Sequence, residues 1–148
     1  MSNGIILFEP VAVANRLRPV LVRLNRHLRK ELAALGVTGL QATLLHEIKS
    51  RPGIGVGELA DAGGISAPAA SGHVDRLEAA GLVRRTRPQG DRRRVGLELT
   101  EGGQRVLRSV RSRRTAWLAA RLKELAPDEI AAIDGAIAPL SRLLEDDA

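Results

Sequence analysis

The side chains best suited to chemistry in this sequence are arginines that gather in one short stretch. Guanidinium groups are permanently charged and bind phosphate oxygens or base edges. A run of charge is usually a solvated face, so two interpretations are open: a solvated basic hairpin, or a surface that binds an anion such as DNA. Six arginines lie within eleven residues, opposed only by Asp91: Arg84, Arg85, Arg87, Arg92, Arg93 and Arg94.

A predicted helix with a small, polar face comes just before these arginines. Ser66 is suited to cap its first turn, and Gly81 to end it in the left-handed conformation. Ala70, Val74 and Leu77 follow the spacing of a buried stripe. The opposite face is open enough for a DNA backbone or base edge to approach, and it carries Pro68, Ser71, Gly72, Asp75 and Arg76. The alternative role for Arg76 is a surface ion pair with Asp75 or Glu78.

The arginines themselves fall on a predicted β-hairpin. Residues 82–87 and 92–100 are typical of strands, because Val95, Leu97 and Leu99 alternate with period two. Residues 88–91 carry the proline, glycine and aspartate of a turn. We expect Asp91 to hold Arg93 or Arg92 by a charge-assisted hydrogen bond and so to aim the guanidinium.

The elements that position this stretch are helices. Residues 57–62 predict a short helix, Gly63 and Gly64 a sharp turn, and residues 54–56 at most a very short strand. A short helix, a tight turn and a second helix form a helix-turn-helix, which the hairpin extends to a winged helix.

Long apolar helices flank this central part. A leucine stripe runs from Leu17 to Leu35 and ends at Gly36; Pro19 either marks the first turn or, as we favour, kinks a helix that began near Val11. Thr38 and Thr100 are expected to cap the helices that follow them, the second running from residue 104 to 125. A last helix opens at Pro127, with Pro139 as an expected kink.

The predicted fold is therefore mainly α with a small β-hairpin wing. Residues 36–100 form a winged helix-turn-helix DNA-binding domain, and residues 1–35 and 101–148 form a helical dimerisation region. The terminal helices either fold back on their own domain or pair with a second copy, and pairing is the economical solution.

Composition narrows the function. The 148 residues carry a net charge of +6. This charge either favours an anionic partner or reflects a GC-rich genome, which encodes arginine where lysine would serve as well. There is no cysteine, and no run approaches the ~18 apolar residues of a membrane span. The three histidines are never three or four apart, and no grouping of Ser, His and Asp stands out. We expect a cytoplasmic protein that is not an enzyme and needs no cofactor or metal.

From Gly57 to Thr100 the sequence resembles the MarR family of bacterial winged-helix transcription regulators. The motifs that carry the resemblance are Glu58-Leu59-Ala60, Gly64-Ile65-Ser66, Val74-Asp75-Arg76-Leu77-Glu78, Gly81-Leu82-Val83-Arg84-Arg85, Asp91-Arg92-Arg93 and Leu99-Thr100-x-x-Gly103. The resemblance implies a homodimer on a pseudo-palindromic operator, often a repressor that a small aromatic or phenolic ligand releases. It places the helix from Ser66 in the major groove and the Arg93 side chain, braced by Asp91, in the minor groove. No motif marks a ligand pocket.

The predicted function is thus that of a dimeric regulator binding double-stranded DNA. The alternative is a winged-helix module that binds an acidic protein through its arginines. The predicted DNA contacts are Ser66, Pro68, Ala69, Ser71, Gly72, His73, Arg76, Arg87, Asp91, Arg92, Arg93 and Arg94.

Overall fold

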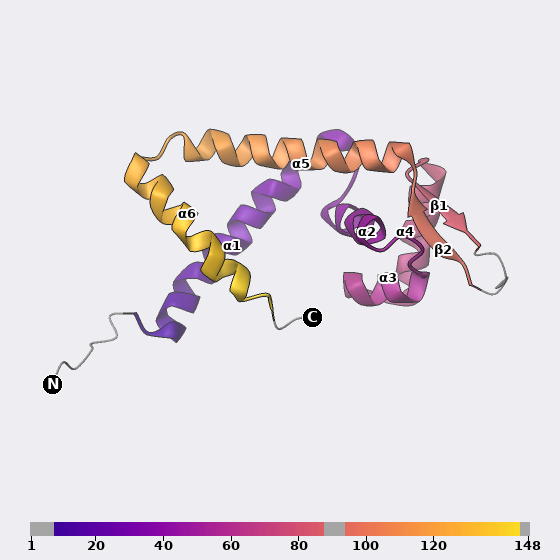
Figure 1. Cartoon of the computed structure of the whole chain (residues 1–148), viewed down its shortest axis with the longest axis horizontal. Coiled ribbons are helices and arrows are strands. Elements are labelled where there is room, and N and C mark those ends of the chain that lie inside the picture. The colour runs from indigo at the N-terminus through magenta and orange to yellow at the C-terminus, as the bar shows by residue number, and fades with distance from the viewer. Residues whose placement is uncertain (1–7, 88–93, 146–148) are drawn as a thin grey trace. The chain divides into compact units, whose positions relative to one another are not determined.

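A computed structural model of the chain describes residues 8–87 and 94–145, and it is helical apart from one short hairpin. The predicted fold class is confirmed. The elements in chain order are α1 (Pro10–Lys30), the 3₁₀ helix η1 (Ala33–Leu35), α2 (Gly39–Ser50), α3 (Val56–Gly63), α4 (Ala67–Ala79), β1 (Val83–Thr86), β2 (Gly96–Leu99), α5 (Glu101–Leu122) and α6 (Pro127–Arg142) (Figure 1).

The chain divides into two compact units, residues 1–113 and 114–148, with the boundary inside α5. The first unit holds α1 to β2 and the first half of α5, and the second holds the rest of α5 and α6. None of the helices among residues 8–87 and 94–145 combines the length and the apolar character needed to cross a membrane.

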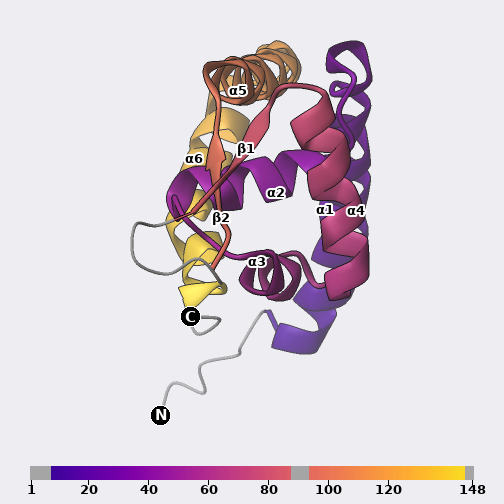
Figure 2. The same ribbon diagram turned by 90° about the vertical axis from the view of Figure 1, so that its right-hand side faces the viewer.

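The core of the first unit lies between α2, α3, α4 and the two strands (Figure 2). Complete burial of an aliphatic side chain contributes about 1.5–3 kcal/mol, so this cluster holds the three helices and the hairpin in fixed positions. Its members are Leu44, Leu45, Ile48, Ile54, Leu59, Val74, Leu77, Val83, Leu97 and Leu99.

The two strands pair antiparallel, with Val83 opposite Leu99 and Thr86 opposite Gly96. Residues 54–56 form no strand of their own; Ile54 makes a single bridge to Leu97. The hairpin is therefore anchored to the core by buried side chains on both strands.

Local capping explains where α2 and α4 begin. The Thr38 hydroxyl accepts from the Gln41 backbone N–H, and the Gln41 side chain accepts from the Thr38 N–H, both at 3.1 Å. Such a capping box satisfies two N–H groups that the helix cannot satisfy itself. The predicted caps at Thr38 and Ser66 are confirmed.

The predicted C-terminal boundary of the first helix is wrong. It was expected to reach Leu35, but α1 ends at Lys30 and η1 follows. The reason is packing: Leu32 is fully buried against Val37, Ala42 and Val110, so the chain leaves the helix axis to bring it inward. Gly36 has φ +70° and ends the segment as expected.

Both internal prolines lie inside helices. Because α1 begins at Pro10, Pro19 does not mark a first turn, and that alternative is wrong. Pro139 lies inside α6.

The second long helix begins three residues earlier than predicted and ends earlier too. It runs from Glu101 to Leu122 rather than from residue 104 to 125. The Thr100 hydroxyl accepts from the Gly103 N–H at 3.0 Å, which confirms the predicted cap. Gly103 is buried, and a Cβ there would clash with the Leu82 carbonyl oxygen. The glycines therefore allow the first turn of α5 to pack closely against the chain before β1.

Candidate nucleic-acid interface

The N-terminal half of α4 is presented outward, as the sequence predicts. The Ser66 hydroxyl accepts from the Ala69 N–H at 3.3 Å, while Gly64, at φ +64°, makes the turn from α3. Ala70, Val74 and Leu77 are buried and fix which side of α4 faces the core. Ser66, Pro68 and Ala69 are consequently exposed, and Ser71, Gly72 and His73 are half-buried.

From Ser66 to Gly72 this surface of α4 carries only short side chains, and the long side chain of Arg76 follows one turn later. A Cβ on Gly72 would lie 3.9 Å from the Arg76 guanidinium, and the guanidinium lies 3.5 Å from Nδ1 of His73. The Arg76 side chain therefore lies back along its own helix over residues one turn earlier. The structure brings Gly72, His73 and Arg76 into one group on the outer face of α4.

Asp75 and Glu78, the two carboxylates near Arg76 on α4, both bind a different arginine. Arg85, on β1, donates to Asp75 Oδ1 from one terminal nitrogen and to Glu78 Oε1 from the other, both at 2.7 Å. This Arg85 clamp joins the wing to α4. The ion pairs that the sequence offered as the alternative role for Arg76 are therefore wrong, because both acids bind Arg85.

The clamp changes the acidity of its own arginine. The hydrogen bond to Asp75 raises the pKa of Arg85 above its usual value; partial burial opposes this, and the charge of Glu78 adds to the increase. The guanidinium thus stays charged, and its single positive charge offsets part of the negative charge of the two acids of α4.

Two more wing arginines have carboxylate partners. Arg84 on β1 pairs with Glu98 directly across the hairpin at 2.9 Å. Arg94, a predicted DNA contact, lies 3.4 Å from Glu58 of α3. Both pairs are largely exposed to solvent, where an ion pair contributes about 0.2–1 kcal/mol and exchanges readily. Arg94 stays a predicted DNA contact, but it is not an unpaired one.

Arg76 and Arg87 differ from these three. In the part of the chain that the structure describes, neither has a carboxylate within ion-pair distance. Both are exposed and carry positive charge without a carboxylate partner among the described residues. Asp91, Arg92 and Arg93 lie outside the described residues, so the predicted brace between Asp91 and an arginine stays a prediction.

Sequence reasoning missed the Arg85 clamp, although a signal was present. Asp75 and Glu78 are three residues apart and lie on the same side of a helix. Both acids look misplaced on a DNA-facing helix unless a cation from another element neutralises them. The nearest basic residues in sequence outside the helix are those of the strand that follows it.

Within residues 8–87 and 94–145, no group of three His, Asp or Glu side chains is arranged to hold a metal ion. A helix-turn-helix with an exposed helix N-terminus, followed by an arginine-bearing hairpin, is the architecture of a winged-helix nucleic-acid-binding domain.

Comparison with known proteins agrees with this class. Residues 35–94 match the model of the MarR family. The chain is 34% identical over 90 residues to YfiV, an uncharacterised HTH-type transcriptional regulator of Bacillus subtilis, which covers 61% of this chain and 56% of YfiV. This chain thus spans little more than half the length of YfiV.

Solved structures extend the likeness to nearly the whole chain. A MarR family protein from Bacillus stearothermophilus is 26% identical, with a TM-score of 0.76 over 93% of this chain and 98% of that one. A mutant of S. aureus MepR, solved bound to an oligodeoxyribonucleotide, is 18% identical, with a TM-score of 0.69 over 90% and 98% of the two chains. Residues 35–94 are thus similar to the MarR family, and the likeness in fold extends over nearly the whole chain.

Proposed function

We propose that this chain is a DNA-binding transcription regulator that acts as a homodimer on a pseudo-palindromic operator. The observation that carries the proposal is the exposed N-terminal half of α4 followed by an arginine-bearing hairpin, with the negative charge of the two acids of α4 partly offset by Arg85. The match of residues 35–94 to the MarR family model and the likeness to the transcriptional regulator YfiV support the regulatory role, and DNA bound to MepR, which shares the fold, supports the kind of ligand.

In this proposal α4 lies in the major groove. The exposed residues Ser66, Pro68 and Ala69 are small, so the backbone of the first turn approaches the DNA closely. The N–H groups of a helix N-terminus favour a phosphate there. Ser71 and Arg76 reach further along the groove. With few long side chains on α4, specificity depends in part on DNA shape as well as on direct contacts to bases.

The wing adds charge beside the groove. Arg87 is exposed without a carboxylate partner among the described residues, and the Arg94–Glu58 pair is open enough for a phosphate to replace the glutamate. Asp91, Arg92 and Arg93 complete the proposed contacts at the tip. Phosphate contacts fix the register of the protein on the duplex, and an arginine in the minor groove reads its width.

Dimerisation is supported by the distribution of exposed apolar side chains. In the described residues, every large hydrophobic side chain that is prominently exposed lies outside the winged helix, between residues 8 and 24 or between 118 and 144. Ile133 and Ile137 of α6 are 44% and 56% exposed. Apolar patches of this kind mark protein interfaces. We therefore propose that residues 1–35 and 101–148 form the dimerisation region.

A two-fold symmetric dimer places two copies of α4 on one face of the duplex. The half-sites are then about one helical turn apart, roughly 10 base pairs from centre to centre. We propose repression as the mode of regulation, with release by a small ligand, and the support for this is the likeness of residues 35–94 to the MarR family. We propose that the protein acts in the cytoplasm, since the relatives it matches are bacterial regulators and bacterial DNA lies in the cytoplasm.

The test is binding to a random DNA duplex, followed by fluorescence anisotropy at several salt concentrations. A protein making 6–10 phosphate contacts loses about 10³–10⁵ in affinity between 50 and 200 mM salt. Arg76→Ala and Arg93→Ala should each weaken binding, the second by about 1–3 kcal/mol if it reads the minor groove.

Lys49→Ala is the matched control, since it removes one positive charge from the exposed side of α2, outside the proposed DNA contacts and the proposed dimerisation region. It should leave the affinity nearly unchanged. Weak duplex binding without salt dependence would instead favour a module that binds an acidic protein, and an equal loss in all three variants would remove α4 and the wing from the mechanism.

A further inference from the structure

The paired arginines of the wing differ in how firmly each is held by its carboxylate. Arg85 donates two hydrogen bonds of 2.7 Å to the acids of α4, and its side chain is 31% exposed. Arg94 makes one contact of 3.4 Å with Glu58 of α3, and these two side chains are 62% and 53% exposed. Of the wing ion pairs that the structure describes, Arg94–Glu58 is therefore the longest, and both of its partners face solvent.

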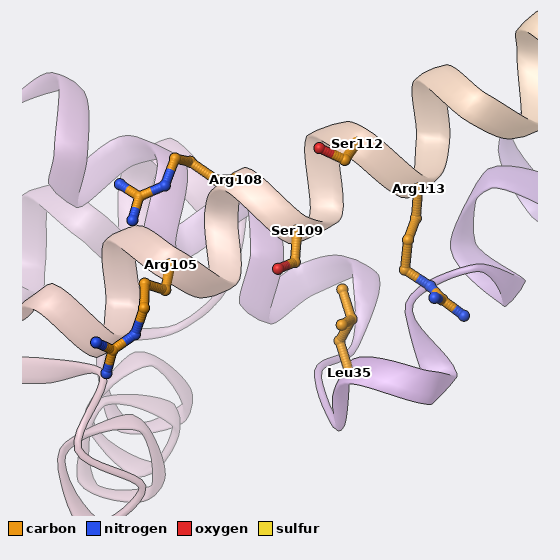
Figure 3. Close-up of a pocket in the computed structure, with 6 residues that line it drawn as sticks. All are labelled: Leu35, Arg105, Arg108, Ser109, Ser112 and Arg113. Carbon is orange, nitrogen blue, oxygen red and sulfur yellow. The ribbon is translucent and has the colours of Figure 1, made fainter.

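The arginines of α5 in the same unit are arranged differently. Figure 3 shows a hollow beside α5, where Arg105 and Arg108 extend away from Arg113. Because these guanidinium groups do not converge, they define no common anion site. The wing instead brings Arg94 to one particular carboxylate, so the replacement of that carboxylate by another anion is a defined exchange. The residues that line the hollow are Leu35, Arg105, Arg108, Ser109, Ser112 and Arg113.

Glu58 does not depend on Arg94 to hold its negative charge. It lies in the first turn of α3, whose N-cap is Gly55 and has no side chain to bond the free N–H groups. The positive end of the helix dipole favours a carboxylate in that turn. The carboxylate lies close to the N-cap, since a Cβ on Gly55 would be 3.7 Å from Glu58 Oε1. Glu58 thus stays in a favourable position when Arg94 changes partner.

The strand that follows Arg94 is held in place. The Gly53 N–H donates to the Leu97 carbonyl oxygen at 2.8 Å, and the Leu97 N–H donates to the Ile54 carbonyl oxygen at 2.9 Å. Gly96 lies so close to this segment that a Cβ there would be 2.9 Å from the Gly53 carbonyl oxygen. β2 is therefore fixed against the segment before α3, and an exchange at Arg94 needs rotation of the side chain rather than movement of the strand.

We propose that Glu58 is an autoinhibitory residue of the DNA-binding surface: it holds Arg94 in the free protein, and a DNA phosphate displaces it on binding. Guanidinium groups often bind phosphate with two hydrogen bonds, whereas Arg94 has a single contact with Glu58. After the exchange, the carboxylate stays on α3 and repels the bound phosphate. Because non-specific binding depends almost entirely on phosphate contacts, Glu58 limits binding to random DNA. The inference rests on the proposed function and adds a residue that weakens that site.

The test is a double-mutant cycle on the full-length protein, measured by anisotropy titration of a random-sequence DNA duplex at one fixed salt concentration. Glu58→Gln should tighten duplex binding by about two- to fivefold, the equivalent of one exposed ion pair. Arg94→Gln should weaken binding. In the Arg94→Gln background, Glu58→Gln should give no gain beyond that of the control, because the competition is already absent.

Asp61→Asn is the matched control. Asp61 is exposed on the same helix, one turn after Glu58, and it makes no ion pair within the described part of the chain. Removing its charge reports the general loss of repulsion toward DNA, which salt screens, and it should change the affinity by less than about twofold. Replacing a residue that only supports the fold would weaken binding, so a gain in affinity separates competition from a structural role.

Two results would overturn the inference and leave the proposed function in place. One is equal duplex affinity of Glu58→Gln and Asp61→Asn. The other is a full gain from Glu58→Gln in the Arg94→Gln background, which would mean that Glu58 repels DNA directly rather than through Arg94. If the unsubstituted protein binds the duplex weakly and without salt dependence, the proposed function itself fails, and the inference fails with it.

Discussion

Replacing Arg85 with methionine removes the charge that joins β1 to α4 while keeping most of the aliphatic stem. In the structure this guanidinium donates two hydrogen bonds of 2.7 Å, one to Asp75 and one to Glu78. Its side chain is 31% exposed, against 65% for Asp75 and 42% for Glu78. The substitution should therefore affect both stability and DNA binding.

The stability loss follows from the two pairs. An exposed ion pair contributes about 0.2–1 kcal/mol, and short charge-assisted bonds that share one half-exposed guanidinium lie toward the upper end. We expect Arg85→Met to lower the free energy of unfolding by about 1–2 kcal/mol. For a chain of this length that corresponds to a decrease of about 2–8 °C in Tm.

The effect on DNA binding has a separate cause. Without Arg85, the carboxylates of Asp75 and Glu78 are left unneutralised on α4, where they repel phosphate. Urea denaturation followed by circular dichroism measures the first effect, and anisotropy titration of a DNA duplex measures the second. Both should be run at the same salt concentration, since surface charges are screened.

Arg84→Met is the matched control. It removes the same charge from the same strand, but the carboxylate partner, Glu98, lies on β2 rather than on α4. We expect a loss of less than about 1 kcal/mol in stability from one exposed pair. If the two variants weaken duplex binding equally, then the loss is one of net charge alone and the reasoning about the clamp is refuted.

Adding Asp75→Asn and Glu78→Gln to Arg85→Met gives a sharper comparison. These amides remove the repulsion without restoring the clamp, so duplex affinity should recover while stability stays low. A triple variant that binds as weakly as Arg85→Met would show that repulsion by the two carboxylates is not the cause.

Two further predictions concern the fold and the assembly. Gly103→Ala should lower the free energy of unfolding by about 1–3 kcal/mol in urea denaturation, because the added Cβ meets the Leu82 carbonyl; Gly135→Ala in α6, where nothing lies within 4 Å, should cause no loss, and equal effects would contradict the packing argument. Ile133→Glu should convert the proposed dimer to monomer in sedimentation velocity, whereas Ala131→Glu, nearer the opposite side of α6, should not; a dimer that survives Ile133→Glu excludes this face from the interface.

Much of the winged helix could be predicted from the sequence because its signals are local. A cap at Thr38, Ser66 or Thr100 forms with a backbone N–H only three residues away. The buried stripe of α4 depends on the helical repeat alone, and it correctly predicts which side of the helix is exposed. The strands carry the matching two-residue repeat in Leu97 and Leu99.

Helix boundaries that depend on packing against distant segments could not be predicted from such local signals. The stripe that ends at Leu35 looks continuous, yet α1 ends at Lys30 because Leu32 packs against Val110, far along the chain. Similarly, the low helix propensity of Gly102 and Gly103 disfavours the start of α5, but Gly103 is the residue that lets the helix approach Leu82. In both cases a contact between remote segments outweighs the local preference.

The sequence by itself determined the class of this protein: a helix-turn-helix, a basic hairpin and apolar terminal helices follow from spacing, capping and charge. Only the tertiary structure decided which arginines are engaged. Arg85 binds Asp75 and Glu78, and Arg94 lies near Glu58, thirty-six residues away, whereas Arg76 and Arg87 have no acidic partner in the described chain. The physical reason is that an ion pair depends on where two side chains meet in space, and residues remote in sequence meet only when the core has placed their helices and strands.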